Sequence, residues 1–162
     1  MKFLDKAEAA LAAETRSSRA DLDEERALVL RTRAIRAAGA QEKMLAATAL
    51  HELEVIANAS RTTTIRRAYS GALGAFFVSE YKYREAIPFL AEDSGSPASM
   101  QRLVLAYAHT GANDQAHLLE LKIAALNEPT IEHALVVPEL RVKLAATKRK
   151  RPFLLRFTGR SH

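Results

Sequence analysis

The sequence predicts an all-α protein built from successive antiparallel helical hairpins, and three observations support this fold class. Alanine and leucine, the two best helix formers, dominate a chain of 162 residues with only six glycines and five prolines. β-Branched residues nowhere alternate with polar ones as they would in strands. Residues 69–91 and 99–121 align at a shift of thirty, so that Leu73 meets Leu103, Phe77 meets Tyr107 and Ala86 meets Ala116. A helix–turn–helix unit that recurs in this way is typical of stacked helical arrays.

The first three helices follow from capping residues and apolar stripes. A helix over 3–13 carries a thin apolar stripe. Ser18 is a suitable N-cap for a second helix, which is acidic in its first turns and basic in its last, as the helix dipole favours. Gly39 supplies its C-terminal stop. A third helix over 41–57 has one apolar face, formed by Leu45, Ala49, Leu53 and Ile56. The short link at Gly39 predicts an antiparallel hairpin.

The middle of the chain predicts a second hairpin. A fourth helix over 62–80 has a buried face formed by Ile65, Tyr69, Ala72 and Phe76. Gly71 and Gly74 lower its helix propensity by about 1 kcal/mol each. We interpret them as positions where a neighbouring helix approaches closely. A fifth helix spans 83–92, although Pro88 would kink or shorten it.

The last helices have clear start signals. Ser96 is an N-cap and Pro97 occupies the first helical position of a sixth helix, which reaches His109. A turn at 110–113 leads to a seventh helix that ends near residue 126. After a break at 127–129, a last helix begins at Thr130, and we expect Pro138 to kink or split it before residue 146.

The second and third hairpins resemble tetratricopeptide repeats. The residues that carry the resemblance are Leu73, Gly74, Phe77 and Ala86 in one unit and Leu103, Tyr107, Gly111 and Ala116 in the next. The chain departs from that family in its period of thirty rather than ~34 residues, in Val104 at a small-residue position and in Glu120 at an aromatic one. The resemblance covers about a third of the chain. The alternative is an irregular α-bundle.

The resemblance implies a concave groove lined by the first helix of each unit. Its positions are Gln101, Leu105, Ala108 and His109 in one unit and Gly71, Ala75 and Ser79 in the other. This lining is small and neutral, so an apolar or helical peptide fits it better than an acidic tail. The alternative is that a neighbouring helix of the same chain buries Leu105 and Ala108.

Charge is segregated along the chain. Eight basic residues and no acidic one follow residue 140, whereas the first 140 residues hold 16 basic and 19 acidic residues, a net charge of −3. The sequence therefore predicts one domain over 1–146 and a basic, aromatic tail over 147–162. Its candidate contact residues are Lys148, Arg149, Lys150, Arg151, Phe153, Arg156 and Phe157. Four consecutive cations stay in contact with solvent or with an anionic partner.

Apolar residues beside this basic run leave several partners open. An anionic membrane surface would accept cations on its headgroups and Phe or Leu in its interface. Single-stranded nucleic acid would stack its bases on the rings. A groove on a partner protein, or the acidic body of this chain itself, would also accept the tail.

No catalytic, metal or cofactor signature is present in the sequence. The absence of cysteine excludes disulfides and thiolate chemistry. His51 and Glu52 begin like a zinc-protease helix, but Val55 stands where the second histidine is needed. No Gly-rich loop follows a strand. We therefore expect neither an enzyme nor a bound cofactor.

These observations predict a cytoplasmic, non-catalytic interaction module, an adaptor or assembly subunit that binds a protein partner and could form homo-oligomers. No apolar run reaches the ~20 residues of a membrane span. The alternative is a small nucleic-acid-binding protein that uses the tail together with Arg31, Arg33 and Arg36.

Overall fold

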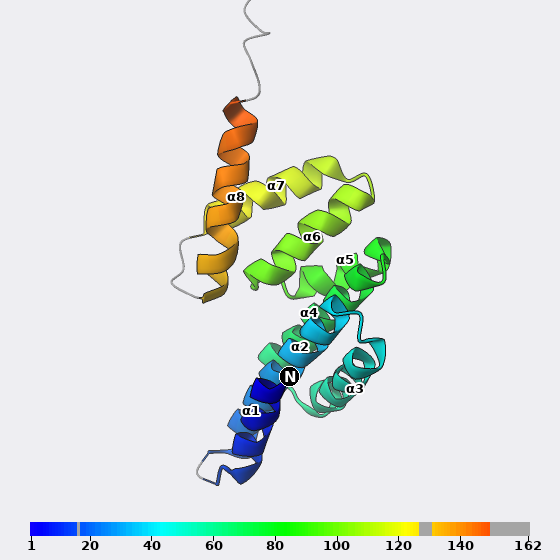
Figure 1. The fold of residues 1–162 in the computed structure, drawn as a ribbon, viewed down its shortest axis with the longest axis vertical. Helices are drawn as coiled ribbons and strands as arrows, with labels where there is room; N and C mark the ends of the chain where they lie inside the picture. The colour runs from blue at the N-terminus through cyan, green and yellow to red at the C-terminus, as the bar shows by residue number, and fades with distance from the viewer. Residues whose placement is uncertain (16, 127–130, 150–162) are drawn as a thin grey trace, which may run out of the picture.

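The computed structural model describes residues 1–15, 17–126 and 131–149, without the side chains of residues 131–133, 135 and 147–149. Within these residues the chain forms eight α-helices and no strand, which confirms the all-α prediction (Figure 1). The helices are α1 (Lys2–Ala13), α2 (Arg19–Gly39), α3 (Lys43–Ala59), α4 (Thr63–Ser79), α5 (Tyr83–Glu92), α6 (Pro97–His109), α7 (Asn113–Ala124) and α8 (Ile131–Arg149).

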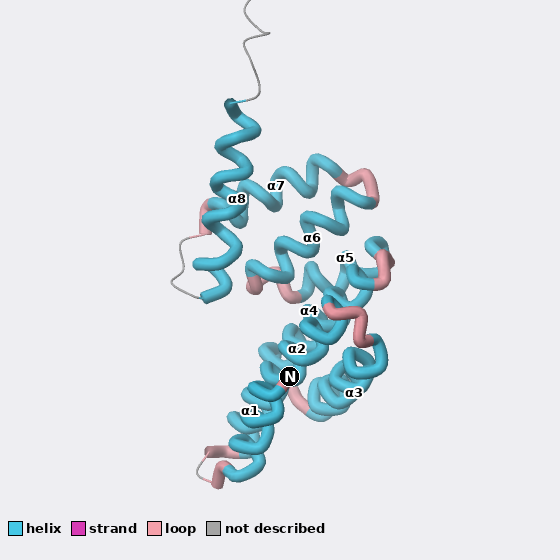
Figure 2. Tube along the Cα trace, viewed as in Figure 1, coloured by secondary structure: helices cyan, strands magenta, loops and turns pink. Residues whose placement is uncertain are grey.

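Three helical hairpins follow one another along the molecule: α2 with α3, α4 with α5, and α6 with α7. The first helix of each hairpin packs on the first helix of the next, α2 on α4 and α4 on α6. α1 packs on α2 at one end, and α8 packs on both α6 and α7 at the other. The turns within the three hairpins lie along one side of the molecule (Figure 2).

The capping residues predicted from the sequence act as caps. The Ser18 hydroxyl accepts a hydrogen bond from the backbone N–H of Asp21 at 3.2 Å, and the Ser96 hydroxyl accepts one from Ser99 at 3.3 Å. Ser18 is therefore the N-cap of α2 and Ser96 that of α6, as predicted. Pro97 occupies the first turn of α6.

α8 is one helix and extends further than predicted. Pro138 lies inside α8, where it is exposed, and does not split the helix. The helix also continues past residue 146 to Arg149. Lys and Arg are good helix formers, and cations are favourable near a helix C-terminus, so the basic run prolongs the helix.

The turns of the three hairpins share one backbone geometry. Each contains a residue of positive φ: Gln41 (61°), Tyr81 (59°) and Gly111 (83°). In each, the N–H of the following residue donates a 2.9 Å hydrogen bond to the carbonyl five residues earlier, in the pairs Glu42–Ala37, Lys82–Phe77 and Ala112–Tyr107. This is the Schellman arrangement of a helix C-terminus. The helix ends at Gly39, where the sequence predicts its end, but Gly39 is the last helical residue and Gln41 is the left-handed one.

Small residues allow the helices to pack closely. The core between α2, α3 and α4 consists largely of buried alanines around Leu30, Leu53 and Ile65. The expected close approach at Gly71 and Gly74 is confirmed. A Cβ at Gly74 would lie 2.6 Å from Leu90 Cγ of α5, and one at Gly71 would overlap the Asp93 carboxylate. Helix α4 therefore needs glycine at both positions.

Candidate functional site

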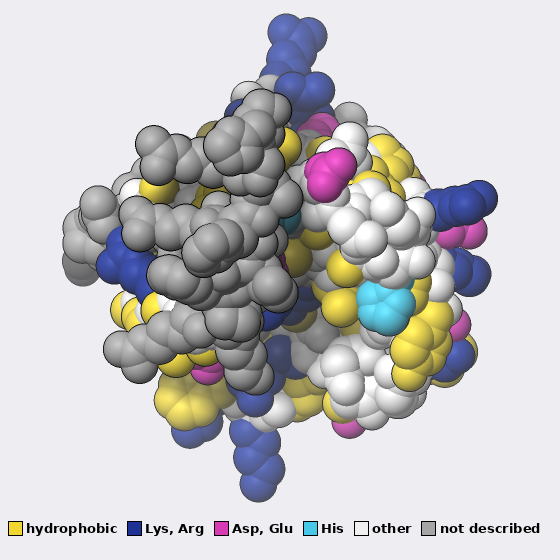
Figure 3. Space-filling view, turned by 90° about the horizontal axis from the view of Figure 1, so that it is seen from above, with side chains coloured by type: hydrophobic (Ala, Val, Ile, Leu, Met, Phe, Trp, Pro, Cys, Tyr) yellow, Lys and Arg dark blue, Asp and Glu magenta, His cyan; other side chains and the backbone are white. Residues whose placement is uncertain are grey.

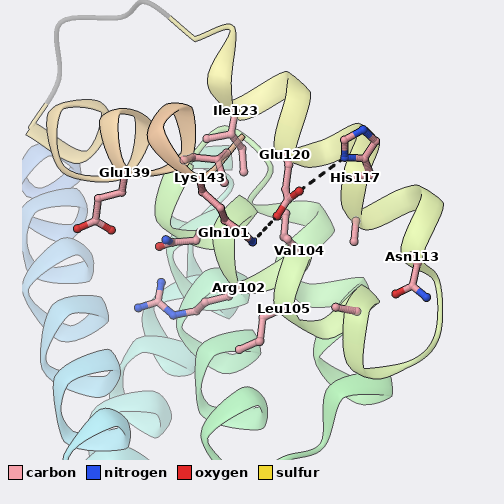
Figure 4. Close-up of a pocket in the computed structure, with 13 residues that line it drawn as sticks. Gln101, Arg102, Val104, Leu105, Asn113, His117, Glu120, Ile123, Glu139 and Lys143 are labelled. Carbon is pink, nitrogen blue, oxygen red and sulfur yellow. Dashed lines mark hydrogen bonds and ion pairs between the residues drawn. The ribbon is translucent and has the colours of Figure 1, made fainter. Parts of the chain in front are cut away.

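An open groove lies between α6, α7 and α8 and is the candidate site (Figure 4). Its volume is about 700 Å³. The apolar part of its lining comprises Val104, Leu105, Ala108, Ala116, Ile123 and Leu140. The polar part comprises Gln101, Arg102, Asn113, His117, Glu120, Glu139 and Lys143. An apolar floor with a polar rim of both charges suits a macromolecular contact better than a single small ion.

The groove exists because α8 covers only part of the surface offered by α6 and α7. Val136, Val137 and Leu140 of α8 form one core with Met100 of α6 and Ile123 of α7. This core uses the first turns of α6 and the last turns of α7. The last turns of α6 remain open, so that Leu105 is 42% exposed and Ala108 is also exposed.

An ion pair and a histidine contact lie on the rim of the groove. Lys143 of α8 lies 2.7 Å from Glu120 of α7, and His117 Nδ1 lies 3.7 Å from the other oxygen of the same carboxylate. The Glu120 side chain is only 13% exposed. Arg102 of α6 and Glu139 of α8 extend into the space between their helices (Figure 4). The rim of the groove therefore carries charges of both signs.

Arg141 fastens α8 to α7 beside the groove. Its guanidinium donates hydrogen bonds of 2.9 Å to the carbonyl oxygens of Ala124 and Leu126. These carbonyls belong to the C-terminal end of α7, where backbone acceptors lack partners within the helix. The guanidinium thus caps one helix and positions another.

Three of the four predicted partner-binding residues line this groove: Gln101, Leu105 and Ala108. The alternative, in which a neighbouring helix buries Leu105 and Ala108, is wrong, since both are exposed. The fourth predicted residue, His109, does not line the groove. Its ring stacks on Tyr83 of α5 with centroids 4.1 Å apart and an interplanar angle of 2°, because the last turn of α6 lies next to the neighbouring hairpin.

The groove positions expected on α4 are not on a surface. Gly71 and Ala75 are buried, and the half-buried Ser79 donates its hydroxyl hydrogen bond to the Phe76 carbonyl. α2, α5 and α6 all pack on α4 and cover this face. The open groove is therefore confined to the end of the array that carries α8.

Asp93 is the centre of a buried polar cluster between the hairpins. Arg31 of α2 lies 2.9 Å from its carboxylate and also donates to the Ser96 hydroxyl at 2.9 Å. The buried Ser99 hydroxyl donates to the same Asp93 oxygen. The sequence does not predict that Asp93 and Ser99 form a buried pair. They lie on opposite sides of the α5–α6 connection, whose sequence indicates only a loop and a helix cap.

This cluster overturns the predicted basic surface at Arg31, Arg33 and Arg36. Arg31 is held by Asp93, and Arg33 is paired with Asp5 at 2.8 Å and Glu8 at 3.1 Å of α1. Arg36 is exposed. Two of the three cations thus hold the fold together and do not form a common anionic-ligand surface.

The predicted tail contacts fall mostly outside the described residues. Lys148 and Arg149 form the last turn of α8. Lys150, Arg151, Phe153, Arg156 and Phe157 lie in the range that the structure does not describe. The predicted tail therefore starts on a helix that also forms one wall of the groove.

The lining of the groove combines apolar side chains with charged ones of both signs. No side chain with a hydroxyl or thiol belongs to this lining. Of its two carboxylates, Glu120 faces Lys143 and His117. In the described part of the chain, no group of three or more His, Asp or Glu side chains is arranged to hold a metal ion.

Comparison of the chain with protein-family models, with curated proteins and with solved structures finds no match. Among the described helices, none combines the length and apolar character needed to cross a membrane.

Proposed function

We propose that this protein is a non-catalytic interaction module, and that its α6–α7–α8 groove binds an amphipathic helical segment of a partner protein. The observation that carries the proposal is Leu105, which is 42% exposed at the open end of a surface that α8 otherwise covers. An aliphatic side chain beside an apolar floor and a charged rim is typical of a helix-binding groove.

α8 itself supports a helical partner. It lies on α6 and α7 through Val136, Val137 and Leu140, so this surface already accepts one helix. A partner helix beside α8 would continue the same packing onto Leu105 and Ala108. Its flanking charges would meet Arg102 and Glu139 on the rim.

The spacing within the hairpins favours the tetratricopeptide-like alternative over an irregular bundle. In each hairpin, one residue of the first helix accepts the Schellman hydrogen bond of the turn, and a buried alanine of the second helix lies nine residues later. The pairs are Ala37–Ala46, Phe77–Ala86 and Tyr107–Ala116. The first pair extends the pattern to α2 and α3. In this proposal α8 ends the array, and the basic tail that follows it strengthens binding to the same partner.

A pair of matched variants tests the groove. Leu105→Glu places a carboxylate on the floor, whereas Leu28→Glu does so on α2 at a site of nearly equal exposure, 40% against 42%. We expect a partner captured from the source lysate by the wild-type protein and by Leu28→Glu, and retained at high salt because the contact is apolar. Leu105→Glu should weaken its binding by about tenfold or more, because an unpaired charge is costly to bury.

Two outcomes would contradict the proposal. The first is capture of the same proteins by Leu105→Glu and by the wild-type chain. The second is recovery of nucleic acid alone, lost at high salt, which would favour phosphate binding by the tail, since such binding weakens steeply with salt.

A further inference from the structure

The turn between α4 and α5 differs from the other two in its side chains. All three turns need a residue of positive φ, and Gln41, Tyr81 and Gly111 occupy that position. Glycine adopts this conformation without strain, whereas a bulky aromatic residue does so at a cost in stability. The third turn shows that glycine satisfies the same geometry in this fold.

Packing does not account for Tyr81. Its side chain belongs to a residue that is 76% exposed, so the ring gains little from burial. It meets Tyr83 edge-on, with centroids 6.4 Å apart, and Tyr83 in turn stacks on His109. An exposed aromatic residue in a strained backbone conformation indicates a binding role.

Cations alternate with these rings. Tyr81, Lys82, Tyr83 and Arg84 follow one another in the sequence, and both cations are exposed. Neither Lys82 nor Arg84 forms an ion pair within the described residues. Glu80, the carboxylate that precedes them, is paired with Lys43 of the neighbouring hairpin at 2.9 Å. Glu85 follows them on α5 and is exposed. Exposed basic side chains also project from the edge of the molecule seen in Figure 3.

We propose that the surface formed by Tyr81, Lys82, Tyr83, Arg84 and His109 binds single-stranded nucleic acid. Such a strand offers flat bases and phosphates, and this segment offers rings and cations. Bases stack on exposed aromatic rings, and Lys and Arg neutralise the phosphates. Tyr83 and His109 already stack face to face, and a base placed on the exposed His109 ring would extend this stack. None of these five residues lines the α6–α7–α8 groove, so the surface goes beyond the proposed protein contact.

The test compares two glycine variants of the full chain in a fluorescence anisotropy titration with labelled oligouridylate and oligothymidylate at low salt. Tyr81→Gly removes the ring and relieves the strained backbone. We expect it to bind about fivefold more weakly or worse, with a melting temperature equal to or above that of the wild-type protein. Gln41→Gly makes the same backbone change in the first turn and should raise stability without weakening binding.

The tail provides the competing explanation, and the full chain retains it in both variants. Equal affinity of Tyr81→Gly and the wild-type chain would overturn the proposal, because the remaining binding would then come from the tail or another basic surface. The proposal would also be overturned if polyphosphate displaced the labelled oligonucleotide as well as unlabelled oligonucleotide does, because polyphosphate offers phosphates and no bases. Absence of any binding by the wild-type chain would also overturn it. Leu105→Glu should bind the oligonucleotides normally, which separates this surface from the groove.

Discussion

Gly71 of α4 lies against Asp93, which follows α5, and Ser99 of α6. A Cβ there would overlap the Asp93 carboxylate and lie 3.0 Å from the Ser99 hydroxyl. Both groups are buried and hydrogen-bonded to each other, so neither moves aside without disturbing the contact with Arg31. The glycine that weakens α4 as an isolated helix is thus required by the polar cluster.

Gly71→Ala should lower the free energy of unfolding by about 1–3 kcal/mol, the usual cost of overpacking a core, despite a gain of about 1 kcal/mol in helix propensity. Gly39→Ala is the matched control. Gly39 is also helical, and a Cβ there meets nothing within 4 Å, so this variant should be neutral or more stable. Denaturant unfolding measures both, and a stable Gly71→Ala protein would show that the cluster tolerates displacement.

The half-buried Tyr69 lies beside a carboxylate, and this environment raises its pKa. Burial, followed by its hydrogen bond to Glu54 and the charge of that carboxylate, raises the pKa of Tyr69 above the ordinary 10.0. The hydroxyl donates to Glu54 at 3.1 Å. The folded protein therefore holds this proton more tightly than the unfolded chain does. Its contribution to stability is complete below pH 10 and is lost as the pH rises through the folded-state pKa.

Tyr69→Phe should remove this pH dependence. We expect the variant to be less stable at neutral pH by about 1 kcal/mol, the net value of a hydrogen bond, and to lose less stability than the wild-type protein above pH 10. Ultraviolet titration of the four tyrosines should show a late phase that is absent in Tyr69→Phe. An unchanged titration would assign the late phase to another ring.

At the scale of the elements, α8 depends on α7 for its position. Arg141 donates two hydrogen bonds to carbonyls at the end of α7, and its side chain is exposed. Arg141→Gln should therefore destabilise the protein by only about 1 kcal/mol but raise hydrogen exchange in residues 136–144 more than in α2. Val142→Gln alters an exposed neighbour and should leave this exchange unchanged. Uniform loss of protection in all helices would mean that α8 is not a separate unit.

Helix boundaries could be predicted because the signals are local. The sequence predicts helix starts at Ser18, Ser96 and Pro97, and the structure confirms these starts. α2 ends at Gly39 as predicted, but the left-handed residue is Gln41, which gives no sequence signal for positive φ. The first hairpin was not recognised as a repeat, because Ala37 stands where Phe77 and Tyr107 stand and because forty residues, not thirty, separate Gln41 from Tyr81.

The groove was predictable only in part, for a reason that concerns the whole molecule. Gln101, Leu105 and Ala108 share one stripe of α6, and helical periodicity suffices to group them. Glu120, Glu139 and Lys143 join them only because α8 folds back over α7. The burial of Gly71 and the stacking of His109 likewise depend on which hairpin lies next to which. Local patterns do not contain that information.

The bond between Arg31 and Asp93 has a consequence for how the molecule unfolds. In an array where each unit touches only its neighbours, a terminal unit can melt while the others stay folded. Arg31 belongs to the first hairpin, yet it reaches past α4 to Asp93 after α5 and to Ser96 at the start of α6. If the first hairpin detached, Asp93 would be left as a buried carboxylate without its cation. We therefore expect the three hairpins to unfold together in one transition, which their repeated architecture alone would not provide.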